Sequence, residues 1–327
     1  MGKPIDWLLS GPPWSRYLTR KELLGQDERQ PVVSVARQDM LASPEMREIV
    51  SELSQWPGPA LTRHNDAAHL LHKLVFLAEL GVVSKDEGIA IVVERIMNSQ
   101  SNEGAFQILT NIPQHFGGSG RDELGWMLCD TPLVLYAMAK LGLEDNPSVQ
   151  SAARHLAGMG GDGGWKCAAS PKLGKFRGPG RKGDPCPYAT LVSLKALSQF
   201  PDWKDSPSCK AGVEVLLQLW QQRHERRPYL FAMGTDFAKL KAPCVWYDIL
   251  HLCDVLTRFP ELKADPRLDE MLDIISATAD PSSRFTAESV WKAWSGWEFG
   301  QKKAPSYLVT LTAVRTLARV GRLRIDK

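Results

Sequence analysis

Residues 149–165 read VQSAARHLAGMGGDGGW, and residues 182–198 read KGDPCPYATLVSLKALS. The first stretch is typical of an apolar helix followed by a glycine-rich turn that ends in the aromatic Trp165. In the second stretch a polar segment precedes a helix that carries Leu191 and Leu194 at helical spacing. Together the two stretches form one unit of two helices, and the rest of the chain repeats that unit.

The unit recurs with a period of about 60 residues. Its further copies pair residues 91–106 with 125–142, 213–231 with 244–259, and 271–285 with 304–321, and a partial copy covers 52–81. The aromatic residues that end the turns are Phe106, Trp165, Phe231 and Phe285, spaced by 59, 66 and 54 residues. The acidic residues that begin the second helices are Asp66, Asp130, Asp184 and Asp248, spaced by 64, 54 and 64 residues. These two independent landmarks with matching periods predict an all-α chain built from helix pairs.

Helix pairs with this period form either an open solenoid or a closed ring. Residues 14–25 and 43–53 add one more pair at the N-terminus, which brings the total to about six pairs. That number favours closure into an α/α toroid with a central cavity. We therefore expect residues 1–327 to form a single toroid domain, with 1–55 as an N-terminal helical segment that packs on the ring.

Composition excludes several classes of protein. The 327 residues are 43% hydrophobic and 24% charged, and the 40 basic and 37 acidic residues leave a net charge of +3, too small for a dedicated nucleic-acid binder. The sequence contains no apolar run of about 18 residues, so we expect no membrane span. The N-terminal stretch lacks the features of a signal peptide, so we expect a cytoplasmic protein with six free thiols, none in a Cys-x-x-Cys pair. No nucleotide cofactor is expected.

The turns resemble those of a known family. SQSNEGAF at residues 99–106 and GGDGGW at 160–165 are similar to the turn motif of squalene cyclases, in which Gln, Gly and an aromatic residue recur. From about residue 50 to 320 the chain resembles prenyltransferase/squalene-oxidase-repeat proteins. This resemblance implies a terpene cyclase-like toroid and leaves the reaction open.

A second resemblance concerns a metal. FRGPGRKGDPCPYATL at residues 176–191 is similar to the zinc-binding segment of protein prenyltransferase β subunits, and the matching residues are Asp184, Cys186 and Tyr188. The resemblance implies a zinc ion held by Asp184, Cys186 and His251. His251 lies one helical turn beyond the family's third ligand, whose position is occupied here by Asp248, an alternative carboxylate ligand.

The recurring acidic residues are candidates for acid–base catalysis. In a toroid, Asp66, Asp130, Asp184 and Asp248 gather at one mouth of the cavity. Neighbouring carboxylates raise one another's pKa, which produces a general acid able to protonate an alkene, epoxide or alcohol. Asp66 and His69 are also three residues apart and can form an acid–base pair. The alternatives are helix N-caps for the acidic residues and a histidine bonded to backbone.

Other residues are candidates for substrate binding. A glycine-rich basic loop offers Arg177, Arg181 and Lys182 to an anionic group such as a diphosphate or carboxylate, or is simply a solvated loop. The aromatic residues expected to line an apolar pocket are Trp165, Tyr188, Trp246 and Tyr247. Core packing is the alternative role for these four residues.

The combined pattern predicts an enzyme that acts on a small hydrophobic substrate, of isoprenoid type and with an anionic group. The expected reaction is acid–base or zinc-assisted cyclisation, isomerisation, elimination or prenyl transfer. Two alternatives stay open: a metal-free lyase or isomerase that uses Asp, His and Cys groups, and a non-catalytic ligand-binding toroid. The oligomeric state does not follow from the sequence.

Overall fold

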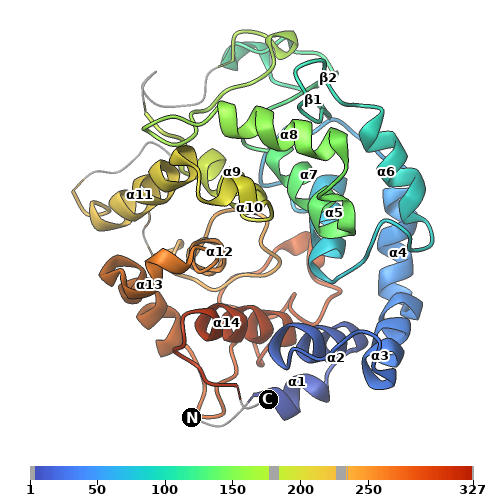
Figure 1. Ribbon diagram of the computed structural model, residues 1–327, viewed down its shortest axis with the longest axis vertical. Helices are drawn as coiled ribbons and strands as arrows, with labels where there is room; N and C mark the ends of the chain where they lie inside the picture. Colours follow the sequence, from blue (N-terminus) through green and yellow to red (C-terminus); the bar gives the residue numbers. More distant parts are fainter. Residues whose placement is uncertain (1–3, 177–183, 226–232, 234, 326–327) are drawn as a thin grey trace. The chain divides into compact units, whose positions relative to one another are not determined.

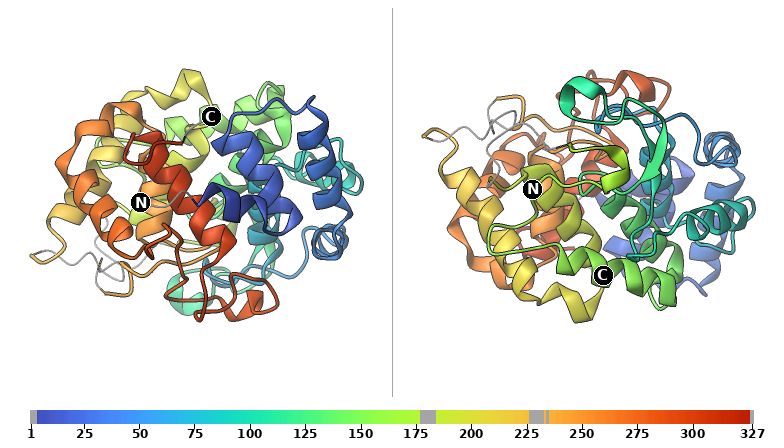
Figure 2. Two further views of the ribbon diagram at one scale, coloured as in Figure 1. Left: turned by 90° about the horizontal axis from the view of Figure 1, so that it is seen from below. Right: turned by 90° about the horizontal axis from the view of Figure 1, so that it is seen from above.

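A computed structural model describes residues 4–176, 184–225, 233 and 235–325. These residues are mostly helical, with one small two-stranded sheet, as Figures 1 and 2 show. The all-α class expected from the repeat is thereby confirmed, whereas closure of the helix pairs into a ring stays a prediction. Contacts divide the chain into two compact units, unit 1 with Met1–Glu48 and Gly234–Lys327, and unit 2 with Ile49–Met233.

The helices of unit 2 follow the two-helix repeat. They are α5 (Leu70–Glu79), α6 (Ile89–Met97), α7 (Thr131–Met138), α8 (Pro147–Gly158), α9 (Pro187–Leu197), α10 (Pro201–Lys204) and α11 (Pro207–Gln221), with the short π- and 3₁₀-helices η2 (Gln114–Phe116), η3 (Ala139–Leu143) and η4 (Pro171–Leu173), while α4 (Pro44–Leu53) spans the boundary between the units. The second helices of successive pairs, α5, α7 and α9, pack side by side (Figure 1). Every residue of α7 and α9 is buried, whereas α8 buries only one face. The second helices therefore form the interior of this unit.

A short hairpin precedes α7. Strand β1 (Ile108–Thr110) pairs antiparallel with β2 (Glu123–Gly125), and the register sets Ile108 opposite Gly125. The hairpin lies against η4, as the views in Figure 2 show. It brings the segment before α7 close to the loop before α9.

Unit 1 combines the two ends of the chain. Its helices are α1 (Ile5–Leu9), α2 (Pro13–Leu18), the π-helix η1 (Thr19–Leu23), α3 (Pro31–Ala42), α12 (Ile249–Leu256), the 3₁₀-helices η5 (Pro260–Ala264) and η6 (Lys292–Trp294), α13 (Pro266–Ala277) and α14 (Tyr307–Arg319). Helix α12 packs on α13 and α14, and α2 packs on α3. The interior of this unit is again formed by second helices, because all residues of α12 are buried.

The same set of hydrogen bonds joins the turn aromatics Trp165 and Phe285 to the helices that follow them. In unit 2 the main-chain N–H of Trp165 donates to Thr190 Oγ1 at 3.1 Å, and that hydroxyl donates to the Trp165 carbonyl oxygen at 3.2 Å. The N–H of Cys186, the residue that caps α9, donates to the same carbonyl at 3.0 Å. These bonds tie the turn to the first turn of α9.

Unit 1 contains the same bonds at the same spacing. The N–H of Phe285 donates to Thr310 Oγ1 at 2.9 Å, and this hydroxyl donates back to the Phe285 carbonyl at 3.3 Å. The N–H of Ser306, which caps α14, donates to that carbonyl at 2.8 Å. The sequence repeat is therefore a structural repeat, in which Cys186 corresponds to Ser306.

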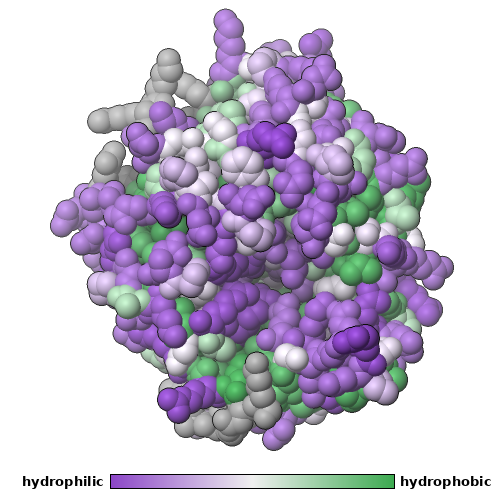
Figure 3. All heavy atoms as spheres, in the orientation of Figure 1, coloured by the Kyte–Doolittle hydropathy of each residue, from purple (hydrophilic) through white to green (hydrophobic). Residues whose placement is uncertain are grey.

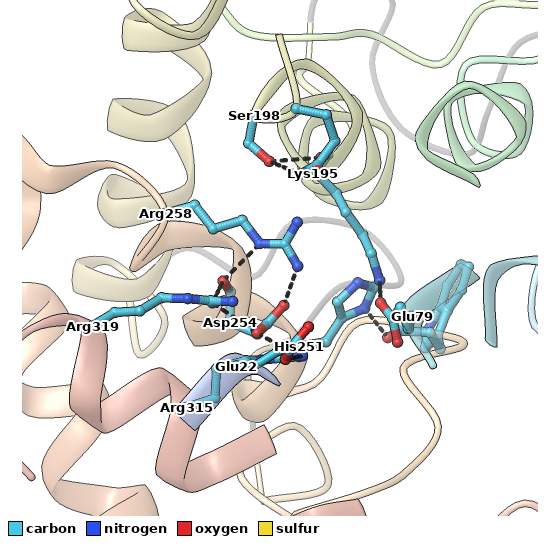
Figure 4. A network of polar contacts seen from close by, with 11 residues as sticks. Glu22, Glu79, Lys195, Ser198, His251, Asp254, Arg258, Arg315 and Arg319 are labelled. Carbon is cyan, nitrogen blue, oxygen red and sulfur yellow. Dashed lines mark hydrogen bonds and ion pairs between the residues drawn. The ribbon is translucent and has the colours of Figure 1, made fainter. Parts of the chain in front are cut away.

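Buried charges are paired within each unit (Figure 4). In unit 1, Asp254 is 1% exposed and accepts hydrogen bonds from the guanidinium groups of Arg258, Arg315 and Arg319 at 2.6, 3.0 and 2.9 Å, while Glu22 also pairs with Arg315. Pairing of this kind offsets the cost of removing a carboxylate from water. We assign this cluster a structural role.

Unit 2 contains one fully buried lysine, on α9. Lys195 Nζ lies 2.5 Å from Glu79 Oε1 and 4.7 Å from the centre of the Tyr136 ring. The carboxylate and the ring together replace the water that a charged ammonium group would otherwise bind. The pair connects α5, α7 and α9.

The surface view in Figure 3 shows a face covered mostly by hydrophilic residues, with apolar residues scattered among them. Within the described parts of the chain, no helix combines the length and the apolar character that crossing a bilayer requires.

Candidate functional site

Three cysteine thiols meet in the interior of unit 2. Cys129 Sγ lies 3.6 Å from Cys167 Sγ and 3.8 Å from Cys186 Sγ, and all three sulfur atoms lie within 4.8 Å of one another. Among the described residues, this is the group of three or more His, Cys, Asp or Glu side chains arranged closely enough to hold a metal ion. Cys129 and Cys186 are buried, and Cys167 is half-buried.

The spacing of the sulfur atoms fits a metal–thiolate centre. A zinc–sulfur bond of about 2.3 Å in a tetrahedron separates two sulfur ligands by roughly 3.8 Å. The two measured contacts of Cys129 agree with this value within 0.2 Å. Thiolates are soft ligands that favour zinc, copper(I) and iron–sulfur clusters over magnesium or calcium. Three thiolates leave a fourth position of the tetrahedron for another group.

Local sequence explains the position of Cys186. The stretch DPCP contains two prolines, and the second, Pro187, is the first residue of α9. A residue before proline is disfavoured in helical conformation, so Cys186 stays extended and becomes the N-cap. Its sulfur accepts the N–H of Ala189 at 3.4 Å. The helix therefore begins two residues later than an Asp184 cap would place it.

The other two cysteines face each other across a short antiparallel contact. Met127 pairs with Ala169, and the N–H of Leu128 donates to the Ala168 carbonyl at 3.0 Å. The chain turns directly after this contact, at residues 128–130, and the turn leaves Cys129 Sγ 3.6 Å from Cys167 Sγ. The contact forms because the β1–β2 hairpin and η4 hold the two loops together.

A histidine–aspartate pair lies beside the thiols. His64 Nδ1 is 2.9 and 3.0 Å from the two carboxylate oxygens of Asp130, which is fully buried. Asp130 precedes α7, but its side chain makes no capping bond to that helix. The Asp130 carboxylate instead bonds to His64, which lies 66 residues earlier in the chain. Cys186 is close enough to His64 to interact with its charge.

The protonation of these groups is interdependent. Burial disfavours the charged form of His64, but the charge and hydrogen bond of Asp130 outweigh burial and raise the pKa of His64. Hydrogen bonds from Cys129 and Cys167 hold the pKa of Cys186 well below its usual range, against burial and with help from the Ala189 N–H and His64. Hydrogen bonds with Cys167 and Cys186, together with burial, hold the pKa of Cys129 well above its usual range. Within the cluster the thiolate form is therefore favoured at Cys186 over Cys129, and the charged form of His64 is favoured by Asp130.

Apolar groups adjoin this site. The Tyr188 ring is fully buried and its centre lies 6.4 Å from that of His64. A small, mostly apolar pocket of about 20 Å³, partly open to solvent, is lined by residues that include Leu128 and Thr131, the immediate neighbours of Cys129 and Asp130 in the chain. The segment that carries a thiol and the carboxylate therefore also forms a pocket wall.

The remaining predicted residues of unit 2 have structural contacts. Asp66 is exposed and its Oδ1 accepts the N–H of Ala68 at 3.1 Å. His69 caps α5, with Nδ1 accepting the Leu71 N–H and Nε2 lying 3.0 Å from the Pro59 carbonyl. Trp165 is fully buried, and its indole N–H donates to the Leu156 carbonyl. Asp184 is half-buried and is not a member of the three-thiol group.

Four predicted residues belong to unit 1. Asp248 caps α12 by accepting the N–H of His251 at 2.9 Å, and His251 Nδ1 lies 2.8 Å from the Trp246 carbonyl. The rings of Trp246 and Tyr247 meet edge to face, with centres 5.7 Å apart. The implied zinc ligands Asp184, Cys186 and His251 are thus divided between the two units, and that ligand set stays a prediction.

The predicted anion-binding residues Arg177, Arg181 and Lys182 lie outside the described residues, as does the turn aromatic Phe231.

Sequence reasoning did not single out three residues of this site. Cys129 directly precedes Asp130, Cys167 follows Trp165 by two residues, and His64 precedes Asp66 by two. Each stands next to a landmark of the repeat. A search for cysteine and histidine beside these landmarks would have found them, whereas a search for Cys-x-x-Cys could not.

No protein-family model and no curated protein sequence matches the chain.

Proposed function

We propose that unit 2 contains a zinc–thiolate centre formed by Cys129, Cys167 and Cys186. The observation that carries this proposal is the convergence of three sulfur atoms within 4.8 Å of one another, with two separations, 3.6 and 3.8 Å, close to those of a tetrahedral zinc site. Cys186 is the one ligand shared with the set that the sequence resemblance implies. The three thiolates leave one zinc position open, which is typical of catalytic rather than structural sites.

The protein is proposed to be an enzyme that acts on a hydrophobic, isoprenoid-type substrate. Zinc would supply a Lewis acid that polarises an oxygen or activates a bound nucleophile. His64 takes or delivers the proton, because Asp130 orients the ring and stabilises its charged form. The apolar pocket beside Leu128 supports a substrate of low polarity. The choice of an isoprenoid derives from the resemblance of the turns alone.

A specific observation favours a second, metal-free function. Cys186, His64 and Asp130 have the order of a nucleophile, a base and an orienting carboxylate, and Cys186 caps a helix N-terminus. In that case the thiolate acts directly as nucleophile or base in a lyase or isomerase reaction. Metal content distinguishes the two functions.

The deciding experiment is elemental analysis of the purified full-length protein. We expect about one zinc per chain in the wild type, and loss of that zinc in Cys129→Ser, Cys167→Ser and Cys186→Ser. Cys244→Ser, which changes a cysteine of unit 1, is the matched control and retains zinc. Absence of zinc from the wild type, or its persistence in all three variants, would contradict the metal centre and favour the metal-free function.

Two further variants test the enzyme. His64→Gln and Asp130→Asn are expected to retain zinc and to lose turnover of isoprenoid alcohols or diphosphates, followed by mass spectrometry of the products. Retained turnover in both variants would exclude proton transfer by this pair. Loss of zinc from His64→Gln would instead identify His64 as the fourth ligand.

A further inference from the structure

Of the three thiols, Cys129 and Cys167 are suited to form a disulfide with each other. The antiparallel contact between Met127 and Ala169 brings together the segments that carry Cys129 and Cys167, and the two sulfur atoms lie 3.6 Å apart. The N–H of Ser170 donates to the Trp126 carbonyl at 2.7 Å, which continues the same register.

Cys186 has a different environment. Its sulfur accepts a backbone N–H at the start of α9, and Pro187 fixes the chain at that point. Its contact with Cys129 is 3.8 Å, longer than the 3.6 Å between Cys129 and Cys167. Cys167 is also the half-buried member of the three, so a reagent reaches it first.

We propose that Cys129 and Cys167 form a reversible disulfide that empties the metal site, so that the proposed zinc centre is under redox control. This inference rests on the proposed function for the metal, and on the 3.6 Å separation of the Cys129 and Cys167 sulfur atoms for the pairing. A disulfide sulfur is a poor metal ligand, since the thiolate is the ligand form of cysteine. Metal binding and the disulfide therefore exclude each other.

The oxidation uses a peroxide as co-reactant. The Cys167 thiol first releases its proton, and the resulting thiolate attacks one oxygen of hydrogen peroxide. The O–O bond breaks, the leaving hydroxide takes up that proton to become water, and a sulfenic acid remains on Cys167. The sulfur of Cys129 then displaces the hydroxyl group, and a second water leaves with the thiol proton. Two thiols and one peroxide thus give one disulfide and two waters. The sulfur atoms must approach from 3.6 Å to about 2.05 Å, which a side-chain rotation achieves.

The test compares zinc-loaded and zinc-free full-length protein treated with hydrogen peroxide. Remaining thiols are then blocked with N-ethylmaleimide, and the disulfide is mapped on peptides by mass spectrometry. We expect the zinc-free protein to lose about 2 Da and to contain a Cys129–Cys167 peptide pair that dithiothreitol separates. The zinc-loaded protein should react at least about tenfold more slowly and release zinc in step with the disulfide.

Two variants separate the pairing from the metal. Cys186→Ser removes a metal ligand and should still form the disulfide, now at the rate of the zinc-free wild type. Cys167→Ser should form none. Circular dichroism before and after oxidation shows whether each variant is folded.

The other possible results of the peroxide experiment contradict either the inferred pairing, the redox control or the metal centre. A Cys129–Cys186 disulfide, or sulfinic acid at Cys167 with no disulfide, contradicts the inferred pairing. Zinc binding without any disulfide overturns the redox inference and leaves the proposed metal centre intact. A disulfide in a protein that never binds zinc overturns the metal centre, and with it the control of that centre.

Discussion

The starts of α9 in unit 2 and α14 in unit 1 have the same backbone and different chemistry. At α14 the cap is Ser306, whose Oγ accepts the Val309 N–H at 3.2 Å and donates to Glu298 at 3.2 Å. At α9 the cap is Cys186, whose sulfur accepts a main-chain N–H at 3.4 Å and contacts the thiol of Cys129 at 3.8 Å. The same backbone at the helix start therefore accepts either serine or cysteine as the N-cap.

At Cys186 the repeat has a less favourable N-cap residue than at Ser306. Serine is among the favoured N-cap residues, and cysteine is a weaker hydrogen-bond acceptor. A locally poor residue at a buried position, where the equivalent position has the favoured one, indicates a role other than stability. At Cys186 that role is the contact with two further thiols, which has no counterpart at Ser306.

The largest expected effect tests whether the two copies are equivalent in packing. Trp165→Ala and Phe285→Ala each remove a fully buried aromatic side chain from the same position of the repeat. Each should lower the free energy of unfolding by about 3–5 kcal/mol, measured by urea denaturation followed by circular dichroism. An effect in only one of the two variants would break the structural equivalence.

The next effect belongs to unit 2 alone and depends on pH. His72 is buried with Nε2 at 2.9 Å from the His64 carbonyl, and burial lowers its pKa to about 4. In the unfolded chain His72 takes up a proton near pH 6.5, whereas in the folded chain it stays neutral until about pH 4. The free energy of unfolding therefore decreases as pH falls from 6.5 toward 4. Between pH 7.5 and pH 5 the loss is about 2 kcal/mol.

The matched measurement uses His72→Asn, which retains a hydrogen-bond donor without the titration. Urea denaturation at the two pH values should show a smaller loss of stability in the variant than in the wild type. An identical loss in both proteins would mean that His72 is not responsible.

A smaller effect tests the hydroxyls shared by both copies. Thr190→Val and Thr310→Val preserve shape and leave the N–H of Trp165 or Phe285 without its acceptor. Each should destabilise the protein by about 1–2 kcal/mol, and by similar amounts because the bonds are the same. Urea denaturation of the two variants side by side checks this, and a difference above 1 kcal/mol would argue that the copies differ in more than their caps.

The smallest effect concerns the caps themselves. Ser306→Ala should cost about 1 kcal/mol, whereas Cys186→Ser in zinc-free protein should be neutral or slightly stabilising, because serine is the better cap. Thermal unfolding in the presence of a chelator measures both changes. A clear destabilisation by Cys186→Ser without metal would show that the thiol cluster contributes to folding on its own.

The sequence predicted the helical framework well, for a physical reason. Phe106, Trp165 and Phe285 end turns that the structure describes, and the helices that follow them are buried as expected. Apolar periodicity and glycine-rich turns are local signals, so they can be recognised in one stretch of chain. Whether the pairs close into a ring depends on how the units meet, which no local pattern specifies.

The candidate site was predicted only in part, because its members come from separate stretches. Cys186 and Asp130, both candidates from the sequence, lie in the three-thiol group and beside it, and their roles stay predictions. Their partners Cys129 and His64 stand 57 and 66 residues away from them, respectively, and no spacing rule connects such positions. Asp130 was expected either to cap its helix or to meet other carboxylates, and its bond to His64 follows from neither expectation.

The amino-acid sequence by itself determined the all-α class and the period of the helix pairs, since both depend on neighbours along the chain, but it misplaced the caps of α5 and α9, which are His69 and Cys186 rather than Asp66 and Asp184. The tertiary structure alone decided which cysteines meet and which carboxylate holds a histidine. Those contacts arise because the β1–β2 hairpin and η4 bring the loops before α7 and α9 together. A thiol interacts only with groups in direct contact with it. Which groups those are depends on the packing of loops that are far apart in the sequence.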